Sequence, residues 1–271
     1  MKPVLLVTLL ALLTGPALAA EPVFDQPLIE GNLITGQVTP GSRLSLDGQP
    51  VHVFEDGRFA FGLHRDTAEQ VMLELIEPNQ APRRLTLAVA QRDYDIQRID
   101  GLPPAQVTPP KELQDRIARE AKAVAEARAR DSALRGFEGP WIWPVEGRIS
   151  GIFGSQRILN GQARQPHYGV DIAGPVGLTI VAPTDGIVSF ANADLYFSGG
   201  TLMIDHGAGV ASAFLHLSEI LVQPGEVVRR GQPIARLGGT GRVTGPHLDW
   251  RVNWFDARVD AQTLVPPMPG Q

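Results

Sequence analysis

The segment from Thr244 to Trp254, TGPHLDWRVNW, contains the residues best placed to do chemistry. As a strand, it turns His247, Asp249 and Arg251 to one face and apolar residues to the other. A histidine and a carboxylate two residues apart on one face point into the same space. This arrangement suits a metal site or an acid–base pair.

Two upstream segments offer similar side chains. His167 and Asp171 lie four residues apart in PHYGVDIA, and His216 lies in FLHLS. Spacing by four would place a pair on one helix face, but Pro166 and Gly169 favour a turn that enters a short strand. Each segment puts a polar group on an otherwise apolar strand, where an unpaired polar group is costly. We therefore expect the three segments to meet at one zinc ion.

The remaining histidines fit structural roles better than ligand roles. His206 ends a strand at a glycine turn in MIDHGAG. His52 and His64 lie in the N-terminal part of the chain without a nearby ligand partner, and we expect both to be non-functional.

Composition excludes several classes of protein. The 271 residues are 43% hydrophobic and 20% charged, which is typical of a globular protein. A net charge of −5 without a long basic run argues against nucleic acid as a partner. The chain has no cysteine, which excludes disulfides, cysteine nucleophiles, cysteine zinc ligands and a lipid-modified cysteine. Any metal must therefore be bound by His, Asp or Glu.

Residues 1–19 have the features of a signal peptide. Lys2 precedes the apolar run Val4 to Leu13, and Ala17-Leu18-Ala19 forms a cleavage site of small residues. This apolar run is shorter than the roughly 20 residues that cross a bilayer. We expect an exported protein of the periplasm or cell envelope, with no transmembrane segment after the signal is removed.

The rest of the chain predicts a mainly β protein with three parts. Residues 22–92 alternate apolar and polar side chains between Asp-Gly pairs, which indicates hairpins with type I′ turns and a small immunoglobulin-like β-sandwich. Residues 93–140 form a linker with a helix at about 110–135, marked by Pro109 and a composition rich in Ala, Glu, Lys and Arg. Residues 141–267 return to glycine-separated strands and predict an antiparallel β domain. We expect the sandwich to serve as a spacer or docking unit.

The C-terminal domain resembles the LytM/lysostaphin-type zinc metalloendopeptidases, which cut peptides of bacterial peptidoglycan. The matching segments follow in family order: GRISGIFG, HYGVDIAG, PTDGIVSFA, MIDHGAGVASAFLHLS and the region ending in TGPHLDWRV. The resemblance implies one zinc ion bound by His167, Asp171 and the residue at position 249. It also implies that His216 and His247 act on the zinc-bound water as catalytic residues.

One residue departs from the family pattern. The family motif ends in His-x-His, whereas this chain has His247-Leu248-Asp249. Aspartate binds zinc at about 2.0–2.2 Å, so the site is altered without losing a ligand. A second carboxylate makes the three ligands and the ion neutral instead of +1, which should weaken the Lewis acid.

Three functions remain open from the sequence. We expect an exported zinc metalloendopeptidase that hydrolyses peptidoglycan peptides through a metal-activated water. The alternative is an impaired family member that activates another envelope hydrolase or binds the cell wall. A third, weaker alternative is a peptidase that acts on another envelope protein.

Overall fold

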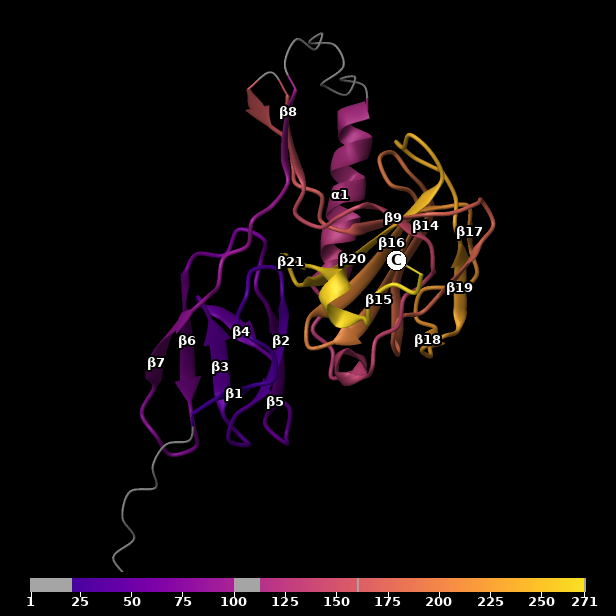
Figure 1. Ribbon diagram of the computed structural model, residues 1–271. Helices are drawn as coiled ribbons and strands as arrows, with labels where there is room; N and C mark the ends of the chain where they lie inside the picture. Colours follow the sequence, from indigo (N-terminus) through magenta and orange to yellow (C-terminus); the bar gives the residue numbers. More distant parts are fainter. Residues whose placement is uncertain (1–20, 100–112, 160, 271) are drawn as a thin grey trace, which may run out of the picture.

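The computed structural model describes residues 21–99, 113–159 and 161–270 (Figure 1). The predicted signal peptide lies outside the described residues, as do Pro109 of the linker and the predicted start of its helix. Within the described ranges, no helix is both long and apolar enough to cross a membrane. The described residues are mainly β, with one α-helix and sheets that are almost wholly antiparallel, as the sequence predicts.

The N-terminal part contains two small antiparallel sheets. The first has the order β1 (Val23–Phe24), β2 (Leu33–Gln37), β5 (Arg58–Gly62). The second has the order β4 (Gln49–Val51), β3 (Arg43–Leu46), β6 (Gln70–Ile76), β7 (Arg83–Ala88). Apolar side chains of both sheets, such as Ile34, Phe59, Leu73 and Leu75, are buried in a common core, which confirms the predicted sandwich.

The two Asp-Gly pairs behave differently. Asp47 and Gly48 join β3 to β4 with φ values of 47° and 83°, so this two-residue loop has the positive φ values of a type I′ turn. At the second pair only Gly57 has a positive φ, so the type I′ prediction is wrong for Asp56-Gly57. There the glycine is required by close packing, since a Cβ would lie 2.0 Å from the Val38 carbonyl oxygen.

The linker includes a strand and a helix. β8 (Ile96–Ile99) pairs in parallel with β10 (Gln156–Leu159), which forms a hairpin with β11 (Gln162–Ala163). The helix α1 spans Gln114–Arg128 and ends before the predicted boundary at about 135. It ends there because the chain after Ala129 turns to join the C-terminal sheet, where the Ala208 N–H donates to the Ser132 carbonyl at 2.9 Å.

The C-terminal part is built on one eight-stranded antiparallel sheet (Figure 1). Its order is β18 (Val227–Val228), β14 (Gly186–Leu195), β15 (Gly199–Gly207), β16 (Val210–Leu217), β20 (His247–Trp254), β12 (Val170–Ala173), β9 (Arg148–Gly151), with β21 (Ala257–Val259) also paired to β20. A smaller sheet has the order β13 (Thr179–Val181), β19 (Pro233–Arg236), β17 (Glu219–Ile220). Short 3-10 helices cover Gly136–Glu138 and Ala261–Leu264.

The apolar face of β20 anchors the core. Leu248, Trp250 and Val252 are fully buried, and the rings of Trp141 and Trp143 lie 6.4 and 5.9 Å from that of Trp250. This confirms the predicted alternation and leaves the opposite face of β20 for polar residues.

The sandwich packs directly on this core. The rings of Phe61 and Trp254 meet edge to face at 6.5 Å. A Cβ on Gly62 would lie 2.8 Å from the Trp254 Cβ. The two parts therefore share one continuous apolar core.

The helix α1 covers the other face of the main sheet. Val124 and Ala127 pack against Met203 and against Leu215 of β16. In the register of β16 and β20, Leu215 lies opposite Asp249, and such pairs share a face. The helix, magenta in Figure 1, therefore lies on the face that carries the predicted site.

Candidate metal centre

Two carboxylates form the floor of the site. β12 and β20 are antiparallel neighbours, and their register places Asp171 directly opposite Asp249. Opposite residues lie on one face within about 5 Å, where like charges are destabilising. The pair therefore requires positive charge close to both carboxylates.

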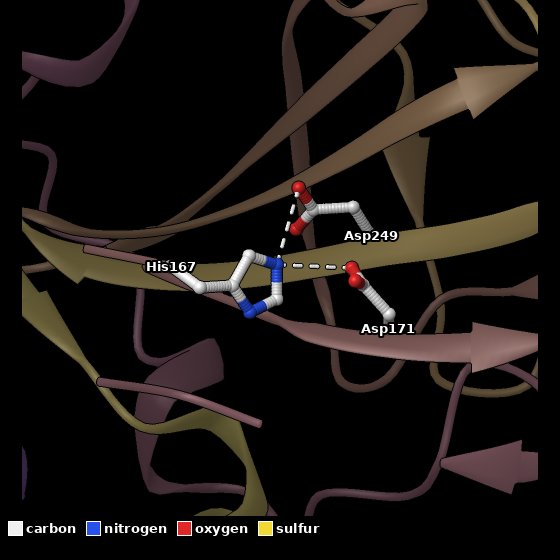
Figure 2. A group of neighbouring side chains, drawn as sticks. All are labelled: His167, Asp171 and Asp249. Carbon is white, nitrogen blue, oxygen red and sulfur yellow. Dashed lines mark ion pairs between the residues drawn. The ribbon is translucent and has the colours of Figure 1, made fainter. Parts of the chain in front are cut away.

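His167 completes a set of three ligand atoms. It precedes β12, and its Nε2 lies 3.0 Å from Asp171 Oδ1 and 3.7 Å from Asp249 Oδ2 (Figure 2). One ligand atom from each residue lies within 4.8 Å of the other two. Two ligands of a tetrahedral zinc ion lie roughly 3.4 Å apart when each bond is about 2.1 Å. The observed separations therefore bracket the spacing that zinc requires.

The donor atoms fit a cation on two further grounds. Asp171 Oδ1 is buried and accepts no hydrogen bond of good geometry from the described part of the chain. An unsatisfied buried carboxylate oxygen is costly unless a cation binds it. In addition, a Cβ at position 169 would lie 2.2 Å from Asp249 Oδ1, so only glycine leaves room for this carboxylate.

Three histidines contact a backbone carbonyl through Nδ1 and so keep Nε2 for the site. The Nδ1 atoms of His167, His216 and His247 lie 3.2, 2.9 and 2.9 Å from the carbonyl oxygens of Ile152, Thr240 and Gly245. A carbonyl only accepts hydrogen bonds, so each Nδ1 carries the proton. In the neutral ring, Nε2 then has a free lone pair for a metal or a proton.

His247 and His216 lie beside the three ligands. His247 Nε2 is 3.7 Å from Asp171 Oδ1, and the rings of His247 and His216 are 4.9 Å apart. His216 has a φ of 66°, which costs free energy for any residue other than glycine. The backbone is thus strained where the histidine is brought toward His247.

The site shifts the pKa values of two histidines in opposite directions. Burial opposes a charge on His167, but Asp171 and Asp249 outweigh burial and raise its pKa to about 10. Metal binding at this nitrogen must therefore release a proton. Burial lowers the pKa of His216, which keeps this ring neutral and able to accept a proton.

Asp249 is held by an arginine on its own strand. Arg251 Nε donates to both carboxylate oxygens at 3.0 and 3.1 Å, and Nη2 donates to Oδ2 at 2.5 Å. Only 4% of the Asp249 side chain is exposed. Burial alone would raise the pKa of Asp249, but Arg251 and His167 hold it far below its ordinary value.

Arg251 changes the charge expected for the site. Three ligands with two carboxylates and a zinc ion sum to zero, and the guanidinium restores the total to +1. That total equals the charge of a His-Asp-His site with zinc. The expectation of a weakened Lewis acid omitted this partner, although period-two alternation already placed Arg251 on the face of Asp249.

The structure thus brings together all five residues singled out in the sequence. His206 lies elsewhere, fully buried between the Asp185 carbonyl and the Ser212 hydroxyl, each at 2.8 Å. Sequence reasoning missed that the sandwich reaches the site, where the rings of His64 and Tyr168 meet at 5.5 Å. No local pattern signals this contact, because the two residues belong to different parts of the chain.

Comparison with known proteins identifies related chains. Residues 165–261 match Peptidase family M23. The chain is 38% identical over 146 residues to peptidoglycan DD-endopeptidase ShyA of Vibrio cholerae, an alignment covering 50% of this chain and 33% of ShyA. It is 37% identical over 126 residues to murein hydrolase activator NlpD of Escherichia coli, covering 46% of this chain and 31% of NlpD.

A solved structure matches over nearly the whole chain. A crystal structure assigned to peptidase M23 from Pseudomonas aeruginosa is 30% identical with a TM-score of 0.70, covering 89% of this chain and 96% of that one. By contrast, the chain spans about a third of the length of ShyA and NlpD.

Proposed function

The chain belongs to peptidase family M23, and we propose that it is an exported zinc metalloendopeptidase that hydrolyses peptide bonds in bacterial peptidoglycan. The observation that carries the proposal is the convergence of His167, Asp171 and Asp249, where the buried Asp171 Oδ1 accepts no hydrogen bond of good geometry from the described residues. We propose that one zinc ion binds there and that the protein acts in the periplasm or cell envelope. The endopeptidase relative ShyA supports peptidoglycan as the substrate.

The three ligands would leave one position open for water. Zinc bound there would lower the pKa of that water and polarise the scissile carbonyl. Arg251 orients Asp249 through two parallel hydrogen bonds, and the Ile152 carbonyl orients the ring of His167. These contacts hold the donor atoms in place before the substrate arrives.

His216 and His247 are proposed to move the protons. Both rings are fixed through Nδ1, so each Nε2 can accept a proton from the attacking water and return it to the leaving amine. Burial lowers the pKa of His216 and keeps its ring neutral, so the Nε2 lone pair of His216 is free to accept a proton at neutral pH.

The other parts of the chain are proposed to present this domain to the cell wall. We propose that residues 22–92 are a spacer or docking unit, residues 93–140 a linker, and residues 141–267 the peptidase domain. The contact between Phe61 and Trp254 supports a fixed relation of the first unit to the third.

The alternative is an activator of another envelope hydrolase. Asp249 replaces a family histidine, and both of its carboxylate oxygens already accept hydrogen bonds from Arg251. This pairing and the similarity to the activator NlpD favour the alternative. Under it, Asp249→Ala would leave the function intact. A peptidase that acts on another envelope protein is a third possibility, and peptidoglycan would then stay uncut.

The test uses the purified chain, peptidoglycan and added zinc, with the soluble products identified by mass spectrometry. We expect cleaved peptides that disappear with a chelator and with Asp171→Asn. As a matched control, Arg229→Gln changes an arginine whose side chain is 75% exposed and should cut as well as wild type. Intact peptides with every metal tested would refute the peptidase proposal and favour the activator.

A further inference from the structure

Among the described residues, one arginine on the face of the metal centre forms no ion pair. Arg258 lies on β21 opposite Asn253 of β20, which alternation places on the same face as Asp249. Its guanidinium lies 5.8 Å from the ring centre of Tyr168, the neighbour of His167. Throughout the described ranges, no carboxylate or carbonyl forms a hydrogen bond or ion pair with this half-buried side chain.

Two other arginines approach the same place, and we call Arg128, Arg251 and Arg258 the arginine cluster. Arg128 comes from the last turn of α1, and its side chain is 14% exposed. Its Nη1 lies 3.2 Å from Asp256 Oδ1, but its buried Nε has no hydrogen-bond partner in the part of the chain that the structure describes. The helix of the linker therefore contributes a cation to the face that carries the site.

The charges of the cluster do not balance. Arg251 is paired with Asp249, and Asp256 is paired with Arg128, so Arg258 has no ion pair of its own among the described residues. Burial, Arg128 and Arg251 lower the pKa of Arg258, and the nearby Asp256 raises it less than they lower it, as expected where like charges lie close together. Keeping three guanidinium groups together costs free energy that one bound anion would offset.

We propose that Arg258 binds a carboxylate group of the peptide substrate, with Arg128 adding to the positive potential of the arginine cluster. One unmatched positive charge fits one carboxylate, and the planar guanidinium offers it two parallel donors. Tyr168 joins this subsite to the metal centre, since its ring centre lies 5.8 Å from the Arg258 guanidinium and it directly follows His167 in the chain. A peptide whose carbonyl reaches the metal can thus place an acidic group on Arg258. The proposal rests on the proposed function and adds that the substrate is an acidic peptide.

The test compares binding of two synthetic peptidoglycan stem peptides by calorimetry. One has its carboxylates free, and the other has them amidated. We expect wild type to bind the free acid about ten-fold tighter or more, and the preference to shrink as salt rises. Arg258→Gln should remove most of this preference, Arg258→Lys should keep part of it, and the exposed control Arg229→Gln should keep all of it.

The outcomes separate this proposal from the enzyme proposal. Equal binding of both peptides by wild type, or no binding of either, would overturn the subsite even if peptidoglycan is cut. An unchanged preference in Arg258→Gln would overturn it as well. A preference that depends on Arg258 in a protein that cuts nothing would support the subsite and refute only the peptidase activity. If Arg258→Gln fails to fold, Arg258→Lys and the salt dependence of wild type decide.

Discussion

The ion pair of Asp249 and Arg251 should be strongly coupled in the metal-free protein. Arg251→Met and Asp249→Asn each remove one partner while keeping a similar volume, and the double variant removes both. The pair is bidentate, with 4% of the aspartate side chain and 27% of the arginine side chain exposed. Breaking a fully buried pair costs about 3–5 kcal/mol, and the partial exposure of the arginine places this pair near the lower end.

The two single variants should not cost the same. Arg251→Met leaves Asp249 opposite Asp171 and removes the guanidinium that offsets one of the two negative charges, so it should cost about 3 kcal/mol of unfolding free energy. Asp249→Asn leaves a guanidinium that can reach water and relieves the repulsion from Asp171, so it should cost about 2 kcal/mol. The double variant should cost less than the sum by about 2 kcal/mol.

Urea unfolding with a chelator present measures the free energy of unfolding of wild type, the two single variants and the double variant. The exposed pair of Asp185 and Arg229 is the matched control, with a single contact of 2.8 Å and exposures of 46% and 75%. Its coupling should stay below about 1 kcal/mol. Additive costs at positions 249 and 251 would refute the reasoning, because they would mean that the arginine does not stabilise the buried carboxylate.

Three further predictions concern the site and its surroundings. Gly169→Ala should weaken zinc binding about ten-fold or more in a competition titration, because its Cβ would displace the Asp249 carboxylate; unchanged affinity would contradict this fit. His216→Asn should abolish peptide cleavage but change the free energy of unfolding by less than about 1 kcal/mol, since asparagine tolerates positive φ. His216→Val should be less stable than His216→Asn by a further 1 to 2 kcal/mol, roughly, because a β-branched residue does not tolerate positive φ. Burial lowers the pKa of His206 to about 4, so between pH 6.5 and pH 4 the unfolded chain binds a proton that the folded chain does not. The contribution of His206 to the free energy of unfolding, about 3 kcal/mol, is therefore present above pH 6.5 and is lost as the pH falls toward 4. In urea unfolding at several pH values, His206→Gln should show a shallower loss of stability toward acid, and an equal slope would show that His206 is not the group responsible.

Local patterns in the sequence predicted most of the elements and the ligands. Alternation in TGPHLDWRVNW placed Trp250 in the core and Asp249 on the opposite face, because strand side chains alternate whatever lies around them. The Asp47-Gly48 turn followed from the positive φ that its geometry needs. The set of His167, Asp171 and Asp249 could be named because family motifs keep their order along the chain.

Tertiary structure decided the properties that depend on distance between segments. The register of β12 against β20 sets Asp171 opposite Asp249, and no spacing within either strand encodes that register. The end of α1 at Arg128 is fixed by contacts that the following chain makes with the main sheet, which override the helix propensity of the residues beyond it. The charge of the site depends on Arg251, and the unmatched charge of Arg258 depends on a helix, a strand and an edge strand that meet on one face. Electrostatic energy depends on spatial separation and burial, so the sequence determined which ionisable groups are present and the fold determined their pKa values and which charges are balanced.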